Sequence, residues 1–292
     1  MSAQPLPAAA LATTVLRCEL EYQVYQPSHF IFQIECARSD DQLLLAEQLT
    51  VTPGVVVRPS TDPADNRTFR CDMVPGLLNL RYDAAVRINR PAPTGLELEA
   101  EISEIPEAVL PYLMPSRFCP SDTMGSDARY LFGHLNRGPS RVDAICRWIR
   151  DNIAYQIGTS NPTTTALDAY QQRAGVCRDF AHLAITFCRA LNIPARLVGG
   201  YCHFDEPPQD FHAVIEAWIG SRWIMFDPTR LAEPSNIVRV ATGLDAKNTA
   251  FATVYGAFQM TYMHIQVSHE GLAPLDNPDP VQATVRRQLM AN

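Results

Sequence analysis

The sequence predicts an α+β protein, in which an N-terminal antiparallel β-sandwich precedes a core where one helix packs on an antiparallel sheet. Three observations lead to this fold class. Hydrophobic and polar residues alternate with period two near the N-terminus, as in VLRCELEYQVYQ at 15–26. Residues 177–191 instead repeat hydrophobic residues at i, i+3, i+4 and i+7, which is one buried face of a helix. Two runs rich in β-branched and aromatic residues, FHAVIEAWI at 211–219 and RWIMF at 222–226, predict neighbouring strands.

The predicted sandwich contains two more alternating runs, FIFQIEC at 30–36 and LRYDAAVRI at 80–88. Proline, glycine and aspartate turns separate these runs, as in an antiparallel sandwich of about 90 residues. Pro91-Ala92-Pro93-Thr94-Gly95 is a candidate linker. We therefore expect a β-rich domain over 1–95, a core over 96–270 and a surface tail over 271–292.

The core is predicted to begin with helices and to end with strands. Ser140 is a candidate cap for a helix that runs to about Ile153, and Thr163–Thr165 are expected to start another that ends near Arg173. A short helix is expected before these, at 106–113, and a candidate helix lies in the tail at 280–290. The strands expected in the core lie near 195–203, 211–219, 222–226 and 250–267.

Cys177 lies where a thiol nucleophile is expected. Gly175 allows a sharp entry into the helix, so Cys177 falls at or near the first helical position. The unpaired N–H groups and the helix dipole at this end favour a negative charge, and the thiolate is the reactive form of cysteine. The alternative is a buried and inert cysteine on an apolar helix, which is the interpretation we favour for Cys188.

His212 and Asp227 are predicted to meet because a hairpin joins their strands. Gly220-Ser221 has the length and composition of a two-residue turn, which pairs His212 with about residue 229. Asp227 would then lie near His212, where a carboxylate fixes the tautomer of the imidazole and stabilises its protonated form. Taken singly, His212 is equally consistent with a sheet histidine, and Asp227 with a turn residue before a proline. Together with Cys177, they have the order of a catalytic triad.

Four ordered motifs make the chain similar to the transglutaminase-like superfamily, in particular to bacterial proteins built around the transglutaminase core. The motifs are GVCRDFA at 175–181, NIPARLVGGY at 192–201, HAVIEAWI at 212–219 and WIMFDPT at 223–229. The resemblance covers about residues 135–230 and implies a papain-like core. Carried over by position, it makes Cys177 the nucleophile, His212 the general base and Asp227 the third member of the triad.

This chain departs from the family pattern at two positions. Asn192 stands where glycine is usual, which is only a different helix stop, and Val214 stands where tryptophan is usual, with Trp218 further along. The second departure changes the wall that faces the substrate and leaves the triad intact. Residues 16–90 also resemble the β-rich domain that precedes this core in many bacterial members.

The expected reaction is acyl transfer through a thioester on Cys177, and the expected substrates are peptide or protein amides. The backbone N–H of Cys177 is the first expected oxyanion donor, and Tyr155 and Gln156 are candidates for a side-chain donor. Hydrolysis is favoured over transamidation of protein glutamine, because the chain lacks the length for the extra domains of large crosslinking enzymes. The family also includes many bacterial members treated as cysteine peptidases.

Residues around the three candidates have simpler expected roles. Asp179 is expected to stabilise the first turn of the helix, and Arg178 to raise the local positive potential. His182 and Cys177 lack a second pair of ligands, and Cys202-His203 are adjacent rather than spaced for zinc, so no metal or cofactor is expected. The proline-rich residues 201–210 are a candidate rim of the site, or an ordinary connection between strands.

Two other functions remain open at this point. Arylamine N-acetyltransferases share the Cys-His-Asp order, but they need a coenzyme A site, and no basic, glycine-rich phosphate cradle is present. A binding module with a relic site is the non-enzymatic alternative. The net charge of −7 argues against a nucleic-acid surface.

Composition also bears on the compartment. No apolar run approaches the ~20 residues of a membrane span, and the first sixteen residues lack the positive charge of a signal peptide. The eight cysteines contain no CxxC pair, and a chain of 292 residues has room for a core that needs no disulfides. This pattern favours free thiols in a reducing cytoplasm.

Overall fold

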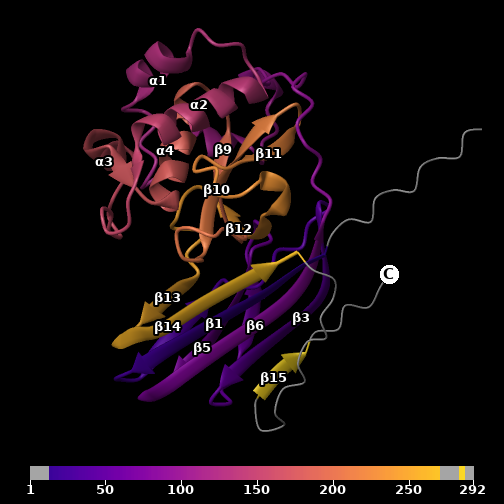
Figure 1. Cartoon of the computed structure of the whole chain (residues 1–292), viewed down its shortest axis with the longest axis vertical. Helices are drawn as coiled ribbons and strands as arrows, with labels where there is room; N and C mark the ends of the chain where they lie inside the picture. The colour runs from indigo at the N-terminus through magenta and orange to yellow at the C-terminus, as the bar shows by residue number, and fades with distance from the viewer. Residues whose placement is uncertain (1–12, 270–282, 287–292) are drawn as a thin grey trace, which may run out of the picture.

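The computed structural model describes residues 13–269 and 283–286, and the predicted α+β class is confirmed. Two antiparallel sheets enclose one hydrophobic core as a β-sandwich. A third antiparallel sheet, covered by the four helices of the described residues, lies above the sandwich in Figure 1 and forms the second core. Among the helices within residues 13–269, none is long and apolar enough to cross a membrane.

The sandwich consists of one five-stranded and one four-stranded sheet, with the orders β14-β1-β6-β3-β15 and β13-β2-β5-β4. Along β1, every second side chain is buried between the sheets, so the predicted period-two pattern is confirmed. The strands are β1 (Thr13–Val24), β2 (Ser28–Phe32), β3 (Gln42–Thr52), β4 (Arg58–Thr61), β5 (Arg67–Met73), β6 (Gly76–Ile88), β13 (Ala252–Tyr255), β14 (Phe258–Ser268) and β15 (Ala283–Arg286).

Three strands from the C-terminal end of the chain correct the expected arrangement. The region 250–267 does form strands, but β13 pairs with β2 and β14 pairs with β1, so neither joins the sheet of the core. Free strand edges carry unpaired backbone groups, and these late strands satisfy them. The candidate helix at 280–290 is wrong at residues 283–286, where β-branched Thr284 and Val285 belong to β15, paired with β3.

The division of the chain into domains at residues 95 and 270 stays a prediction. The strand pairing shows that the N-terminal sandwich is completed by residues beyond the core, so the chain leaves the sandwich and returns to it. The remainder of the predicted tail lies outside the described residues.

The core sheet has the order β11-β10-β9-β12, and a short parallel pair, β7 with β8, lies beside it. The short helix expected at 106–113 is a single 3-10 turn at Leu110–Leu113. Helix α1 and strand β12 are additional elements that the sequence analysis does not predict. The helices are α1 (Gly125–Phe132), α2 (Pro139–Asn152), α3 (Ala166–Gln172) and α4 (Cys177–Ala190). The strands are β7 (Ala154–Tyr155), β8 (Ala174–Gly175), β9 (Ala195–Tyr201), β10 (His212–Ile219), β11 (Arg222–Phe226) and β12 (Val238–Gly243).

Helix α4 lies at the centre of the core, between the other helices and strands β9 and β10. The face predicted from its periodicity is buried, including Phe180, Leu183 and Phe187. Cys188 is also fully buried, and burial raises the pKa of its thiol to about 12. Cys188 therefore behaves as the inert core residue that the sequence predicted.

Local chemistry explains where the preceding helices begin. Thr165 and Asp168 form the capping box of α3, in which the Thr165 N–H donates to Asp168 Oδ2 at 2.8 Å. Helix α2 begins at Pro139, with Gly138 at the cap position, which is two residues earlier than the predicted Ser140 cap implies. Proline suits the first helical position because it has no N–H to leave unpaired and its φ is already helical.

A buried ion network joins the sandwich to the core. Glu216 on β10, with a side chain only 1% exposed, pairs with Arg239 of β12 and lies 2.7 Å from Arg196 of β9. Arg239 also pairs with Asp41 of the sandwich at 2.8 Å, and Arg90 binds the second oxygen of Asp41 at 2.7 Å. Burial raises the pKa of Glu216, but the charges of Arg239 and Arg196 outweigh it and hold the pKa below its usual value.

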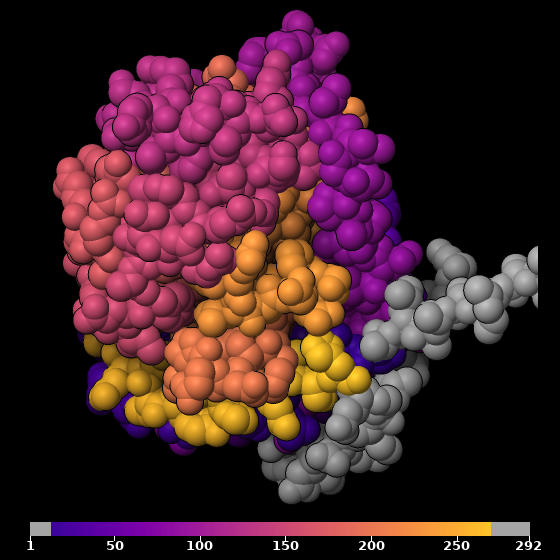
Figure 2. All heavy atoms as spheres, turned by 45° about the horizontal axis from the view of Figure 1, so that its top comes forward, coloured from indigo at the N-terminus to yellow at the C-terminus, as the bar shows by residue number. Residues whose placement is uncertain are grey.

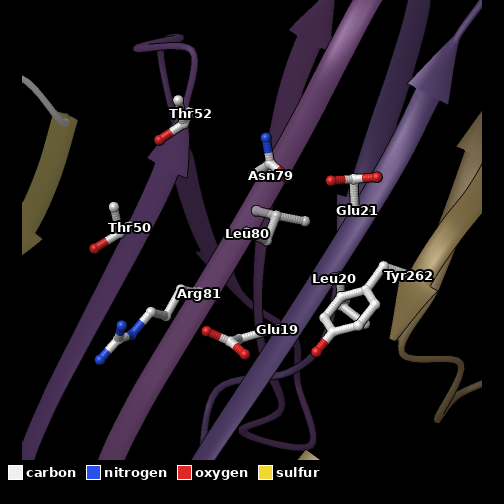
Figure 3. Close-up of a pocket in the computed structure, with 9 residues that line it drawn as sticks. All are labelled: Glu19, Leu20, Glu21, Thr50, Thr52, Asn79, Leu80, Arg81 and Tyr262. Carbon is white, nitrogen blue, oxygen red and sulfur yellow. The ribbon is translucent and has the colours of Figure 1, made fainter. Parts of the chain in front are cut away.

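A hollow of about 350 Å³ lies on the outer face of the five-stranded sheet (Figure 3). The strand register places Glu19 opposite Arg81 and Glu21 opposite Asn79, with Tyr262 beside Glu21 on the edge strand β14. Its lining residues all belong to β1, β3, β6 and β14. The hollow is therefore separate from the predicted nucleophile, which lies on a helix of the core.

Candidate active site

Cys177 is the first residue of α4, as predicted, and its side chain is half-buried. Asp179 accepts the N–H of Val176 through Oδ2 at 2.9 Å, so it stabilises the first turn as expected. Gly175 is required by this close turn, because a Cβ there would lie 2.7 Å from the Cβ of Asp179. The thiol is thus held at the helix end where the dipole favours a negative charge.

The predicted hairpin brings His212 and Asp227 together. Strands β10 and β11 pair next to the turn, with Ile219 opposite Arg222. The turn residues Gly220 and Ser221 have φ values of +59° and +62°, as a type I′ turn requires. His212 Nε2 lies 2.9 Å from Asp227 Oδ2, and each side chain is 1% exposed. The two groups therefore form a hydrogen-bonded pair shielded from water.

The side chain of Cys177 lies close enough to His212 to raise the pKa of the imidazole. Because Asp227 occupies Nε2, the ring nitrogen left for the thiol is Nδ1. Burial lowers the pKa of His212, but the hydrogen bonds and charges of Asp227 and Cys177 outweigh it and raise the pKa to about 10. The imidazole is therefore able to hold a proton beside a thiolate at neutral pH.

The carboxyl group of Asp227 is kept ionised by its surroundings. Burial raises its pKa, but the hydrogen bond and charge of His212 outweigh burial and hold the pKa below its usual value. Hydrogen bonds from Thr229 and from the backbone N–H of Ala232 act in the same direction. An ionised carboxylate at this place can fix the tautomer of His212 and stabilise its protonated form.

Tyr155 is the nearest of the two expected side-chain donors to the thiol. Parallel pairing of β7 with β8 places it opposite Gly175, two residues before Cys177. Its phenol lies close to both the backbone and the thiol of Cys177, which act on its pKa. Burial, followed by the charge of Cys177, raises the pKa of Tyr155, so the phenol remains protonated. Gln156 is exposed, and its backbone N–H donates to the carbonyl of Gly175.

The expected rim, residues 201–210, contacts the histidine directly. Phe204 is buried, and its ring centroid lies 5.6 Å from that of His212. Burial raises the pKa of Asp210. This effect is larger than the opposite effects of the Phe211 N–H and of the charge of His212, so the pKa lies above its usual value. On the other side, Arg178 donates to the carbonyl of Asn161 at 2.9 Å. These contacts tie residues 201–210 to His212 and the loop at Asn161 to the helix that begins at Cys177.

His182 is not part of this arrangement, although it lies only five residues after Cys177. Its Nε2 accepts the N–H of Ala246 at 3.1 Å, and its ring stacks on Phe118 with centroids 5.2 Å apart. Burial lowers the pKa of His182 to about 3, despite the nearby charge of Asp245. It is therefore a neutral histidine of the core.

Two connected hollows lie on the Asp227 side of the site. One, of about 360 Å³, is lined by Asp227 itself together with residues of α2 and of the loop after β11. The other, of about 490 Å³, extends to Pro91–Gly95, and Figure 2 shows it between the helices and the purple residues that follow β6. The two share Asp143, Phe226, Glu233 and Pro234. Neither includes Cys177 in its lining, so they approach the triad only from its acid end.

Known proteins resemble this chain in sequence and in structure. The sequence model of the transglutaminase-like superfamily matches residues 127–228. A solved structure from Cytophaga hutchinsonii, named as a candidate cysteine protease, has a TM-score of 0.86 at 34% sequence identity. That match covers 96% of this chain and 99% of the other. The similarity therefore includes the sandwich as well as the core.

Curated relatives match over a shorter length. An uncharacterised protein of Mycobacterium leprae is 33% identical over 149 residues, which is 47% of this chain and 52% of its own. An uncharacterised protein of Mycobacterium tuberculosis is 28% identical over 196 residues, which is 62% of this chain and 56% of its own. This chain thus spans about half the length of the curated relatives it matches.

Proposed function

Since this chain belongs to the transglutaminase-like superfamily, we propose that it hydrolyses amide bonds of peptide or protein substrates with a Cys177-His212-Asp227 triad. One observation carries the proposal. His212 is hydrogen-bonded to the carboxylate of Asp227, its pKa is raised by Asp227 and by the nearby Cys177, and the thiol of Cys177 lies at the N-terminus of a helix. These are the parts that a thiol nucleophile needs: a base, a group that orients the base, and a positive potential.

The proposed reaction has two steps. The thiolate of Cys177 forms a bond to the carbonyl carbon, the C–N bond breaks, and His212 gives its proton to the leaving amine. The result is a thioester on Cys177. His212 then takes a proton from water as the water oxygen attacks the thioester, and the C–S bond breaks to release the acid and restore the thiolate. Asp227 stays ionised throughout and stabilises the protonated form of His212.

Hydrolysis is the preferred outcome, and transamidation is the alternative at the same thioester. The Cytophaga relative, 34% identical over nearly its whole length, is named as a candidate cysteine protease, which supports hydrolysis. The two outcomes differ only in whether water or an amine attacks the thioester. A glutamine-containing peptide incubated with a primary amine separates them, because mass spectrometry distinguishes the acid from the substituted amide.

We also propose a reducing compartment for this protein. All eight cysteines are free thiols, as the sequence predicted, and seven of them are buried. A half-buried thiol such as that of Cys177 is preserved where glutathione and thioredoxin keep thiols reduced, which supports the cytoplasm.

The direct test of the mechanism is the pH dependence of Cys177 alkylation by iodoacetamide, read by mass spectrometry. We expect fast reaction well below pH 8, where an ordinary thiol with a pKa of about 8.5 is mostly protonated. Since the pKa of His212 is about 10, acyl transfer that needs its proton should fall as pH rises through that value. Alkylation needs only the thiolate and should not fall there. Slow alkylation with the profile of an ordinary thiol would instead support a binding module.

Tyr155→Phe is expected to lower amide hydrolysis about 100-fold, the usual cost of one oxyanion donor. The phenol of Tyr155 lies beside Cys177 and stays protonated, because burial raises its pKa. It can therefore donate to the substrate oxygen that the backbone N–H of Cys177 also binds. Alkylation of Cys177 forms no oxyanion, so its rate should change far less than hydrolysis does.

Tyr130→Phe is the matched control, because Tyr130 is 85% exposed on α1 and far from the thiol in sequence. It should leave both rates unchanged. Unaltered hydrolysis in Tyr155→Phe would rule out the donor role. An equal loss of hydrolysis and alkylation would mean that the hydroxyl acts by stabilising the thiolate.

A further inference from the structure

The loop that follows β11 surrounds the carboxylate of Asp227 with donors. Thr229 gives Oδ1 two hydrogen bonds, from its N–H at 2.8 Å and from its hydroxyl at 2.7 Å. Oδ2 accepts the N–H of Ala232 at 3.0 Å and faces His212 Nε2 at 2.9 Å. Arg230, with a φ of +56°, turns the chain back so that these N–H groups point at the carboxylate. Both oxygens of Asp227 are thus held by two donors each.

The hydroxyl of Thr229 is fully used in this loop. It donates its one hydrogen to Asp227 Oδ1, and its oxygen accepts the N–H of Leu231 at 3.1 Å. The same oxygen lies 3.5 Å from His212 Nε2. Thr229 is buried, so no bulk water can replace the hydroxyl if it is removed.

We propose that Thr229 is a positioning residue, whose hydroxyl holds Asp227 in the orientation that keeps Oδ2 on Nε2 of His212. The effect of Thr229 on catalysis rests on the proposed function, whereas its hydrogen bonds to Asp227 do not depend on that function. A carboxylate can rotate about its Cβ–Cγ bond, and the two donors on Oδ1 prevent this. Without the hydroxyl, one donor on Oδ1 remains, and the hydrogen bond to His212 loses its fixed direction.

The proposal predicts a change in His212 rather than only a loss of stability. The raised pKa of His212 depends on Asp227, so a carboxylate that is less well oriented should lower it. Other titratable groups near the pair act equally in all variants and set a common background. They are Cys177 on α4, Asp210 before β10, Cys146 on α2 and Cys202 after β9.

The first experiment is an NMR titration of the His212 ring in the full chain, in wild type, Thr229→Val and Thr229→Ser. Valine has the shape of threonine but lacks the hydroxyl, whereas serine keeps it. We expect the pKa of His212 to fall by about one unit in Thr229→Val and to stay near the wild-type value in Thr229→Ser. A pKa near 9 still leaves His212 protonated at pH 6, so alkylation there should not change, whereas the pH above which acyl transfer falls should drop by about one unit in the valine variant alone.

Thr186→Val is the matched control for stability. Thr186 is also buried, and its hydroxyl donates to the carbonyl of His182 at 2.8 Å, away from the triad. Both valine variants should melt at lower temperature, but only Thr229→Val should change the titration of His212. If Thr229→Val does not fold, Thr229→Ala against Thr229→Ser gives the same comparison.

An unchanged His212 titration in a folded Thr229→Val would overturn the proposal and reduce Thr229 to a structural role. That outcome leaves the proposed function untouched, since wild-type Cys177 would still be activated. Conversely, a wild-type Cys177 with ordinary reactivity would defeat the proposed function, while the titration would still report whether Thr229 orients Asp227. The two failures are therefore distinguishable.

Discussion

His212→Ala is expected to lower the rate of acyl transfer by on the order of 10⁶-fold, because one side chain both sustains the thiolate and delivers the proton. At neutral pH, His212 holds a proton, since its raised pKa of about 10 lies well above the solution pH, and this positive charge would favour a thiolate on Cys177. Removing the imidazole leaves Asp227 without its cationic partner, and its uncompensated negative charge then disfavours a second negative charge in the site.

Two assays measure this effect separately. Peptide hydrolysis reports the whole reaction, and iodoacetamide labelling of Cys177 at pH 6 reports only the thiolate. Both should collapse in His212→Ala. His264→Ala is a suitable control, because His264 lies on the exposed part of β14, on the sandwich. If labelling at pH 6 survives in His212→Ala, the helix N-terminus alone activates the thiol. His212 would then not be the base that the proposed mechanism requires.

Glu216→Ala is expected to lower the free energy of unfolding by about 3–5 kcal/mol, the usual cost of removing one partner from a buried ionic network. The substitution leaves Arg239 and Arg196 without their shared carboxylate, and the side chain of Arg239 is only 9% exposed. The loss also loosens the junction between sandwich and core, because Arg239 is the group that reaches Asp41.

The effect has a defined pH dependence. The pKa of Glu216 is lower in the folded protein than its ordinary value of 4.5, so its stabilisation is complete above about that pH and is lost as pH falls below it. Urea unfolding should therefore show the full difference between wild type and Glu216→Ala at pH 7 and a smaller one at pH 3.

An exposed ion pair provides the comparison. Glu101 is 65% exposed and pairs with Arg137 at 2.6 Å, so Glu101→Ala should cost no more than about 1 kcal/mol. A loss in Glu216→Ala that is no larger than this would show that the buried network does not hold the two parts together. Glu216→Gln keeps the shape without the charge and should lie between the two.

The elements closest to the thiol could be predicted because their signals are local. The period of the apolar residues in α4, the glycine before it and the two-residue turn at 220–221 act over a few positions. Hairpin pairing then follows from counting residues, which brings Asp227 to His212 without any information from the rest of the chain.

The contribution of Tyr155 was only half visible in the sequence. Tyr155 and Gln156 were equal candidates, because neighbours on a strand face opposite sides and nothing nearby selects one of them. The parallel pairing of β7 with β8 favours Tyr155, since it places this residue opposite Gly175. The role of Thr229 could not be predicted for a different reason. The Asp-Pro-Thr motif is visible in the sequence, but the hydrogen bonds of Thr229 to Asp227 depend on a left-handed turn at Arg230.

The sequence by itself determined the fold class, the nucleophile helix and the hairpin, and hence which three residues are candidates for the triad. Only the tertiary structure decided that β13 and β14 return to the sandwich, and that Asp41 meets Arg239 across some 200 residues of chain. Periodicity and turn chemistry record interactions between neighbours. Pairing of distant segments depends on which free edges and charges remain after the local elements have formed, and no short stretch of sequence carries that information.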